Sequence, residues 1–189
     1  MANFITAFHI TMTNEGGYSN NPNDRGGETY AGIASNFWPK WPGWPIVRQI
    51  VAQKPANLNT ALRTNAQLQT FVEDFYKKNF WDDLSLDALN HQQSANQLFD
   101  TSVNMGSGIG AKFLQQAVNA LKPNTLVVDG QVGAKTIAAA NACTDEALYN
   151  EICALRKARY MAIIAANPAL AVFEKGWLSR ITPFNSSLS

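Results

Sequence analysis

Apolar residues recur at the spacing of an α-helix through most of this 189-residue chain. Steps of three and four residues repeat within each stripe, as in a helix with one buried face. No series of strands alternates with the stripes, so we expect a mainly α fold and no α/β sheet. The stripes comprise Leu68, Phe71, Val72 and Phe75; Leu98, Phe99, Ser102 and Val103; Phe113, Leu114, Ala117, Val118 and Leu121; and Leu170, Phe173, Trp177 and Ile181.

Capping and breaking residues separate these helical segments. Ser85, Thr144 and Asn167 are predicted N-caps, and Pro168 suits the first position of the last helix. The glycines between residues 106 and 110 are expected to break the chain after Asn104.

The N-terminal segment, residues 2–14, is predicted to be a helix with Ile5, Phe8 and Met12 on one face. Glu15 falls at the next step of that stripe, and the two glycines that follow it end the helix. Burial and the negative end of the helix dipole would both raise the pKa of the Glu15 carboxyl. Glu15 is therefore a candidate general acid; the alternative is a solvated residue in a frayed last turn.

Residues 18–33 are dense in Asn, Asp, Gly and Pro, which predicts turns with a short β-hairpin or an irregular polar loop. Within this loop, Asp24 supplies a second carboxylate and Thr29 a hydroxyl. Glycoside hydrolysis uses an acid that protonates the leaving oxygen and a second carboxylate that stabilises positive charge or positions water. The hydroxyl can orient that water. The alternative is that Asp24 caps a turn and Thr29 has no special role.

Three blocks of the sequence resemble glycoside hydrolase family 108, N-acetylmuramidases that cleave peptidoglycan. The blocks occur in the family's order, and the second resembles the peptidoglycan-binding-type region of that family. The first holds Glu15-Gly16-Gly17-Tyr18, Asn21-Pro22, Asp24, Gly26-Gly27, Thr29 and Gly32-Ile33; the second Phe99-Asp100, Val103-Asn104, Gly106, Leu114-Gln115, Ala117, Asp129-Gly130, Gly133 and Thr136; the third Phe173, Gly176-Trp177 and Arg180.

The resemblance implies a lysozyme-like helical fold in which Glu15 is the catalytic acid. It supports Asp24 and Thr29 as its partners, with Tyr18 and Tyr30 as candidate substrate-binding residues. Two positions depart from the family pattern: Asn21 stands where many members have Asp, and Arg25 where Pro is common. The first departure leaves Asp24 as the better second carboxylate, with Glu28 as a rival.

Asp100 and Asn104 lie one helical turn apart and share a face. They are either candidate substrate-binding residues of a cleft or structural hydrogen-bonding residues. The turn at residues 129–133 either binds the wall, as the resemblance suggests, or packs the C-terminal lobe on the catalytic lobe. We expect a catalytic lobe at residues 1–92 and a C-terminal helical lobe at residues 93–189, packed together as one compact unit.

The predicted activity is hydrolysis of the β-1,4 bond between N-acetylmuramic acid and N-acetylglucosamine. One alternative is a lytic transglycosylase, which needs the acid but no activating second carboxylate. The other is a non-catalytic protein that binds the wall or assists secretion; the set of Glu15, Asp24 and Thr29 argues against it.

Composition excludes some classes of binding partner. The net charge of +1 argues against a nucleic-acid-binding protein, and no apolar run of a length that spans a membrane occurs. Because the first residues do not read as a secretory signal, we expect synthesis in the cytoplasm. Action on the wall or periplasm would then follow export by a holin, as for an endolysin, or by another non-classical route. We also expect a monomer with peptidoglycan glycan strands as partner.

No cofactor or metal is expected, since His9 and His91 lack a ligand-spacing motif. Cys143 and Cys153 would lie about 15 Å apart on one helix, which favours two free thiols. The segment between Trp38 and Pro45 holds three tryptophans among prolines and is not expected to form a regular helix. Its rings either fill a gap against the core or line a sugar cleft.

Overall fold

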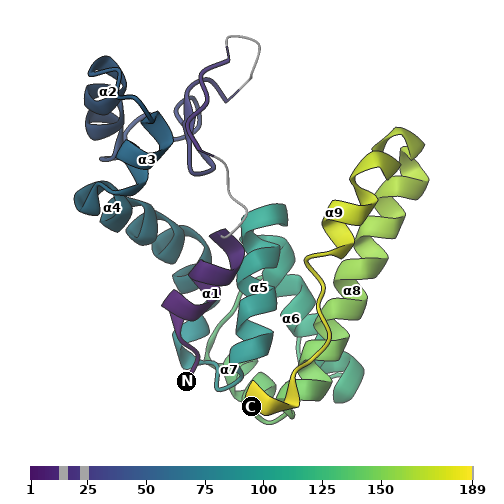
Figure 1. Ribbon diagram of the computed structural model, residues 1–189. Coiled ribbons are helices and arrows are strands. Elements are labelled where there is room, and N and C mark those ends of the chain that lie inside the picture. Colours follow the sequence, from purple (N-terminus) through teal and green to yellow (C-terminus); the bar gives the residue numbers. More distant parts are fainter. Residues whose placement is uncertain (13–16, 22–25, 189) are drawn as a thin grey trace. The chain divides into compact units, whose positions relative to one another are not determined.

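The computed structural model describes residues 1–12, 17–21 and 26–188 (Figure 1). The chain forms two compact units: Met1–Ile10 with Lys78–Ser189, and Thr11–Lys77. In the described residues the structure is mainly α-helical with one short antiparallel hairpin, so the predicted fold class is confirmed. The predicted lobes at residues 1–92 and 93–189 stay a prediction. No helix in the part of the chain that the structure describes is long and apolar enough to cross a membrane.

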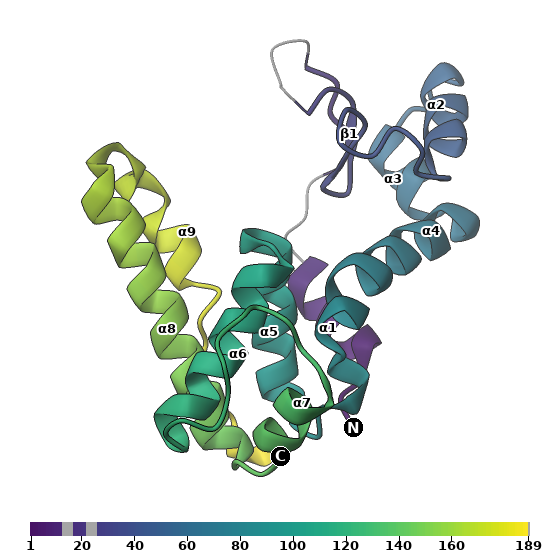
Figure 2. The same ribbon diagram turned by 180° about the vertical axis from the view of Figure 1, so that it is seen from behind.

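The unit that contains the C-terminal half is a helical bundle. Its centre is formed by α5 (Gln92–Met105), α6 (Ser107–Leu121) and α8 (Asp145–Ala166), which pack on one another (Figures 1 and 2). Phe4, Trp81 and Phe99 meet edge to face in its core, with ring centroids 5.7–5.9 Å apart. The other elements are α7 (Ala134–Asn141), α9 (Glu174–Leu178), η2 (Asp82–Leu84), η3 (Leu86–Ala88), η4 (Pro168–Phe173) and η5 (Ser186–Leu188), together with most of α1 (Phe4–Met12) and η1 (Lys77–Trp81).

Two of the predicted N-caps are confirmed. Thr144 Oγ1 accepts a hydrogen bond from Ala147 N at the start of α8, and Asn167 caps η4. Ser85 was expected to cap a helix, but it has a φ of +52°, caps nothing with its side chain and precedes only the short turn η3. Helix α5 instead begins at Gln92.

Of the three glycines after α5, the first breaks the chain as predicted and the other two do not. Gly106, with a φ of +89°, separates α5 from α6, but Gly108 and Gly110 lie inside α6. A side chain at Gly110 would collide with Ser102 on α5. This glycine therefore permits the close approach of α5 and α6 instead of breaking the chain.

Helix α1 confirms a helical N-terminal segment, but the predicted buried face is partly wrong. Ile5 is 41% exposed, whereas Phe4, Ala7 and Phe8 are buried. The stripe is shifted by one residue because Phe4 fills the aromatic core beside Trp81 and Phe99. Phe8 remains on the buried face, as expected.

The other unit combines the hairpin with three helices. Strands β1 (Thr29–Tyr30) and β2 (Ile33–Ala34) pair antiparallel, with Tyr30 opposite Ile33. Ala31 and Gly32 connect them with φ values of +47° and +77°, as in a type I′ turn. The helices are α2 (Trp44–Ala52), α3 (Leu58–Arg63) and α4 (Ala66–Tyr76).

Two of the three rings in the tryptophan-rich segment are buried and one is partly exposed. Trp41 and Trp44 are buried and contact each other edge to face at 5.3 Å, so these two rings fill the core. The segment was expected to be non-helical throughout, but Trp44 begins α2 because Pro45 is tolerated in the first turn. Trp38 remains 41% exposed.

Elsewhere, Cys143 and Cys153 are free thiols, as favoured by their spacing.

Replacing Ala31 with Asn should stabilise the hairpin by about 1 kcal/mol, because Asn tolerates a left-handed backbone and Asn-Gly is the favoured type I′ pair. Slower amide hydrogen exchange at Ser35, whose N–H donates to the Glu28 carbonyl across the hairpin, together with urea unfolding, would measure the gain. Gly32→Ala is the matched opposite and should weaken the hairpin, since Gly32 also has a positive φ. Faster exchange in Ala31→Asn would contradict this reading of the turn.

Candidate active site

Glu15 and Asp24, the predicted acid and second carboxylate, lie outside the described residues. The structure describes the chain on both sides of each: α1 up to Met12, residues 17–21, and the chain from Gly26 onward. Of the remaining predicted site residues, Tyr18, Thr29 and Tyr30 belong to the unit Thr11–Lys77. Asp100 and Asn104 belong to the other unit.

Gly17 and Tyr18 are anchored to α3. The Tyr18 main-chain N–H donates to Asn59 Oδ1 over 2.9 Å. A side chain at Gly17 would have to displace the same Asn59 side chain. Tyr18, three residues after Glu15 in the sequence, therefore has a main-chain attachment to α3.

Tyr18, Glu28 and Arg48 form a polar cluster. The Tyr18 hydroxyl donates to Glu28 Oε1 over 3.1 Å, and Arg48 Nε donates to Glu28 Oε2 over 2.9 Å. Partial burial raises the pKa of the Tyr18 phenol, and the hydrogen bond to Glu28 and the negative charge of Glu28 raise it further. Both Glu28 oxygens are thus engaged, and the Arg48 charge balances the carboxylate.

Thr29 lies in a short ladder that closes the loop holding Asp24. Its main chain exchanges two hydrogen bonds with Ser19, of 2.9 and 2.8 Å. Its hydroxyl donates to the Gly27 carbonyl over 3.3 Å. Because that bond uses the hydroxyl proton, the Thr29 oxygen can still accept a hydrogen bond from another group.

Tyr30 supports the hairpin from the interior. Only 2% of its surface is exposed, and its hydroxyl accepts a hydrogen bond from Gln69 Nε2 on α4 over 3.0 Å. Burial raises the pKa of its phenol. The structure thus places Thr29 and Tyr30 on β1 and Tyr18 next to Ser19, which bridges to Thr29, while their contact with substrate stays a prediction.

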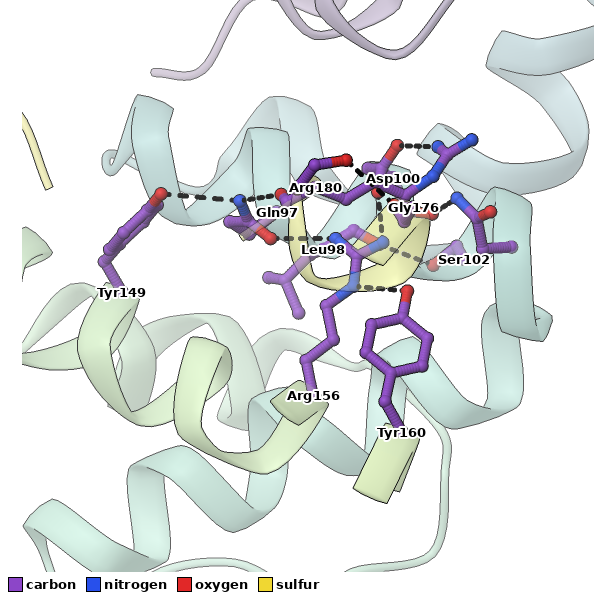
Figure 3. Close-up of polar contacts among 11 residues, drawn as sticks. Gln97, Leu98, Asp100, Ser102, Tyr149, Arg156, Tyr160, Gly176 and Arg180 are labelled. Atoms are coloured by element: carbon purple, nitrogen blue, oxygen red, sulfur yellow. Dashed lines mark hydrogen bonds and ion pairs between the residues drawn. The ribbon is translucent and has the colours of Figure 1, made fainter. Parts of the chain in front are cut away.

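Asp100 is part of a buried ion-pair network (Figure 3). Arg156 of α8 is fully buried and donates to Asp100 Oδ2 and, over 2.8 Å, to Gln97 Oε1. Its Nε donates to the Tyr160 hydroxyl over 3.1 Å. Arg180 donates to the second Asp100 oxygen over 2.8 Å. Asp100 therefore has a structural role that joins α5, α8 and the C-terminal segment.

Asn104 is exposed at the end of α5, and its amide donates to the Asp100 main-chain carbonyl over 2.7 Å. The two residues do share a helix face, as the spacing predicted. Their role as substrate-binding residues stays a prediction.

The turn at residues 129–133 is fixed to α6 by a buried glutamine. Gln115 is 2% exposed; its Nε2 donates to Asp129 Oδ1 over 2.7 Å and its Oε1 accepts from Gly130 N over 2.9 Å. The hydrogen bond from Gln115, with one from the Gln131 main chain, lowers the pKa of Asp129. These contacts explain how the turn is held by its own bundle.

Several residues of the polar network were not predicted from the sequence. Gln93 and Gln97 precede Asp100 and Asn104 at steps of four, three and four, so all four lie along one side of α5. Gln93 exchanges two hydrogen bonds of 2.9 Å with the main chain of Asn185. A polar stripe at helical spacing was the signal available in the sequence. Arg48 and Asn59 carried no comparable signal.

Comparisons with known proteins identify the family. Residues 8–106 match the family model "Glycosyl hydrolase 108", and residues 109–182 match "Predicted Peptidoglycan domain". The chain belongs to glycosyl hydrolase family 108. It is a glycoside hydrolase that acts on peptidoglycan, as the sequence predicted.

A solved structure described as "Structure of Brucella abortus SagA" is similar over almost the whole chain. The two sequences are 26% identical, the match covers 94% of this chain and 88% of that chain, and the TM-score is 0.64. Among curated proteins, none matches the chain. Within the described residues, no group of three or more His, Cys, Asp or Glu side chains could hold a metal ion.

Replacing Asp100 with Asn should lower the free energy of unfolding by roughly 3–5 kcal/mol, because it leaves the buried Arg156 without its counter-charge. Urea unfolding measures the loss. Asp83→Asn is the matched control: Asp83 is exposed, and its replacement should change stability by less than about 0.5 kcal/mol. Equal effects of the two substitutions would contradict a structural role for the Asp100 network.

Proposed function

We propose that this peptidoglycan hydrolase is an N-acetylmuramidase that cleaves the β-1,4 bond between N-acetylmuramic acid and N-acetylglucosamine. Glu15 is the general acid that protonates the bridging oxygen. The observation that carries the proposal is the family match over residues 8–106, which spans Glu15, Asp24 and Thr29. The hydrogen bond from Tyr18 N to Asn59 supports it, since it holds the chain three residues after the proposed acid, and catalysis depends on oriented groups.

Asp24 is the proposed second carboxylate. The contacts of its rival support this choice: Glu28 already accepts hydrogen bonds from Tyr18 and Arg48 on separate oxygens. A carboxylate engaged in this way is less available to stabilise an oxocarbenium-like state or to accept a proton from water. Glu28 then serves to hold Tyr18 and the loop end.

Thr29 is proposed to position the attacking water. Its hydroxyl proton is directed to the Gly27 carbonyl, so its oxygen would accept a hydrogen bond from the water. The other proton of that water would pass to Asp24 acting as general base. The ladder with Ser19 holds Thr29 at one end of the loop that contains Asp24.

Replacing Glu15 with Gln should lower wall-clearing activity by roughly 10²–10⁴-fold, because the leaving oxygen loses its proton donor. Turbidity clearing of purified walls measures the loss, and circular dichroism checks the fold. Glu146→Gln is the control, since Glu146 is an exposed residue in the first turn of α8. Full activity of Glu15→Gln would exclude Glu15 as the acid.

Mass spectrometry of the wild-type products tests the bond and the reaction. The proposal requires a reducing N-acetylmuramic acid end, which hydrolysis produces. An anhydro end would instead identify a lytic transglycosylase, and a reducing N-acetylglucosamine end would overturn the assigned bond.

Asp24→Asn should reduce kcat much more than Glu28→Gln, because only Asp24 is proposed to act on the reacting atoms. Glu28→Gln should act mainly on stability, through loss of its ion pair with Arg48. Steady-state kinetics on peptidoglycan together with urea unfolding separate the two effects. A larger kcat loss in a folded Glu28→Gln variant would reverse the assignment.

A further inference from the structure

Phe37 and Trp38 form an exposed aromatic pair in the unit that holds the hairpin. Phe37 is 68% exposed and Trp38 is 41% exposed. A single exposed apolar residue is common on protein surfaces and needs no explanation. Two adjacent large rings on a fixed turn are a stronger indication of a binding surface.

The main chain of the Phe37–Trp38 pair is held by hydrogen bonds. Phe37 N and Trp38 N both donate to the Ala34 carbonyl, over 3.1 and 2.9 Å. The Trp38 carbonyl in turn accepts from the buried Trp44 indole over 2.8 Å. The rings are therefore presented by an ordered turn that directly follows β2.

The Trp38 ring is also fixed from one side. It packs edge-on against Phe75 of α4, with centroids 4.8 Å apart and an interplanar angle of 88°. This contact orients Trp38 while leaving part of the ring exposed. A preoriented ring loses little conformational entropy when a ligand stacks on it.

The two residues before the Phe37–Trp38 pair are hydrogen-bonded to the end of the loop that contains Asp24, the proposed second carboxylate. Ser35 N donates to the Glu28 carbonyl over 2.8 Å, and Asn36 N donates to the Gly26 carbonyl over 3.1 Å. Gly27 has a φ of +69°, and the Asn36 side chain occupies the space that a side chain at Gly27 would need. Phe37 thus directly follows a residue bonded to Gly26, which is two residues from Asp24 in the sequence.

We propose that the Phe37–Trp38 pair is a sugar-binding subsite for the glycan strand of peptidoglycan. The apolar C–H face of a pyranose ring stacks on the exposed Phe37 ring, and Trp38, which Phe75 orients, supplies the second aromatic contact with the strand. The proposal rests on the proposed function in one respect, that the loop between Ser19 and Thr29 carries the catalytic Asp24. A glycan strand bound near this loop would then extend over the aromatic pair.

A second exposed phenylalanine offers a matched control in the other unit. Phe173 is 52% exposed and stacks on Trp177 with centroids 5.9 Å apart. It lies in the region matched by "Predicted Peptidoglycan domain". Removing its ring tests whether any exposed aromatic residue affects glycan binding.

The experiment measures binding of peptide-free glycan strands by calorimetry in the full chain carrying Glu15→Gln, so that turnover does not consume the ligand. Phe37→Ala should weaken binding by about 3- to 10-fold, the range for loss of one aromatic contact. Phe37→Leu should weaken it to a similar extent, because it keeps apolar area but loses the planar face. Phe37→Tyr and Phe173→Ala should each stay within about twofold of the parent affinity.

Thermal unfolding checks that these exposed substitutions leave the fold intact. Unchanged affinity in Phe37→Ala would overturn the proposal, as would full affinity in Phe37→Leu, which indicates an apolar contact without stacking. Weakening by Phe173→Ala with no effect of Phe37→Ala would assign glycan binding to the other unit and also overturn it.

Failure of the proposed function gives a different result. If Glu15→Gln still cleaves walls, or if Asp24→Asn keeps the parent kcat, the proposed catalytic roles fail by themselves. The aromatic pair is then tested in the otherwise wild-type enzyme, where Phe37→Ala should raise KM by about 3- to 10-fold with little change in kcat. An unchanged KM in that background would overturn the subsite.

Discussion

The buried guanidinium of Arg156 is the constraint on which the helical bundle depends. A fully buried charge is stable only when its donors are satisfied and its charge is balanced. Gln97, Asp100 and Tyr160 give each Arg156 nitrogen a hydrogen-bond partner from two helices, and Asp100 supplies the opposite charge. Arg180 adds the C-terminal segment through the second Asp100 oxygen. The network therefore fixes how α5, α8 and the end of the chain pack together, at residues far apart in the sequence.

The unit with the hairpin depends on a different interaction. Glu28 sits at the end of the loop that contains Asp24 and is held by Tyr18 and Arg48. The type I′ turn at Ala31-Gly32 sets the register of the hairpin, and the ladder continues through Ser35 and Asn36 to Glu28 and Gly26. These contacts give the described ends of the loop fixed positions, which a hydrolase needs for orienting catalytic groups.

Much of the fold could be read from the sequence because helices are specified by local patterns. Thr144 and Asn167 cap the elements they were expected to cap, and the hairpin lies in the predicted polar loop. The errors came from tertiary packing. Ile5 fits the helical period but is exposed, since Phe4 takes the core position, and Gly110 lies inside a helix because α5 approaches α6 closely.

The sequence by itself determined the family, the mainly α class and the candidate set of Glu15, Asp24 and Thr29, because motif residues and helical periods are local. Only the tertiary structure decided that Asp100 is neutralised by two arginines and that Glu28 is paired with Arg48. It also decided which tryptophans are buried and which ring stays exposed. Charge pairing and burial depend on contacts between distant segments, and no local pattern encodes those contacts.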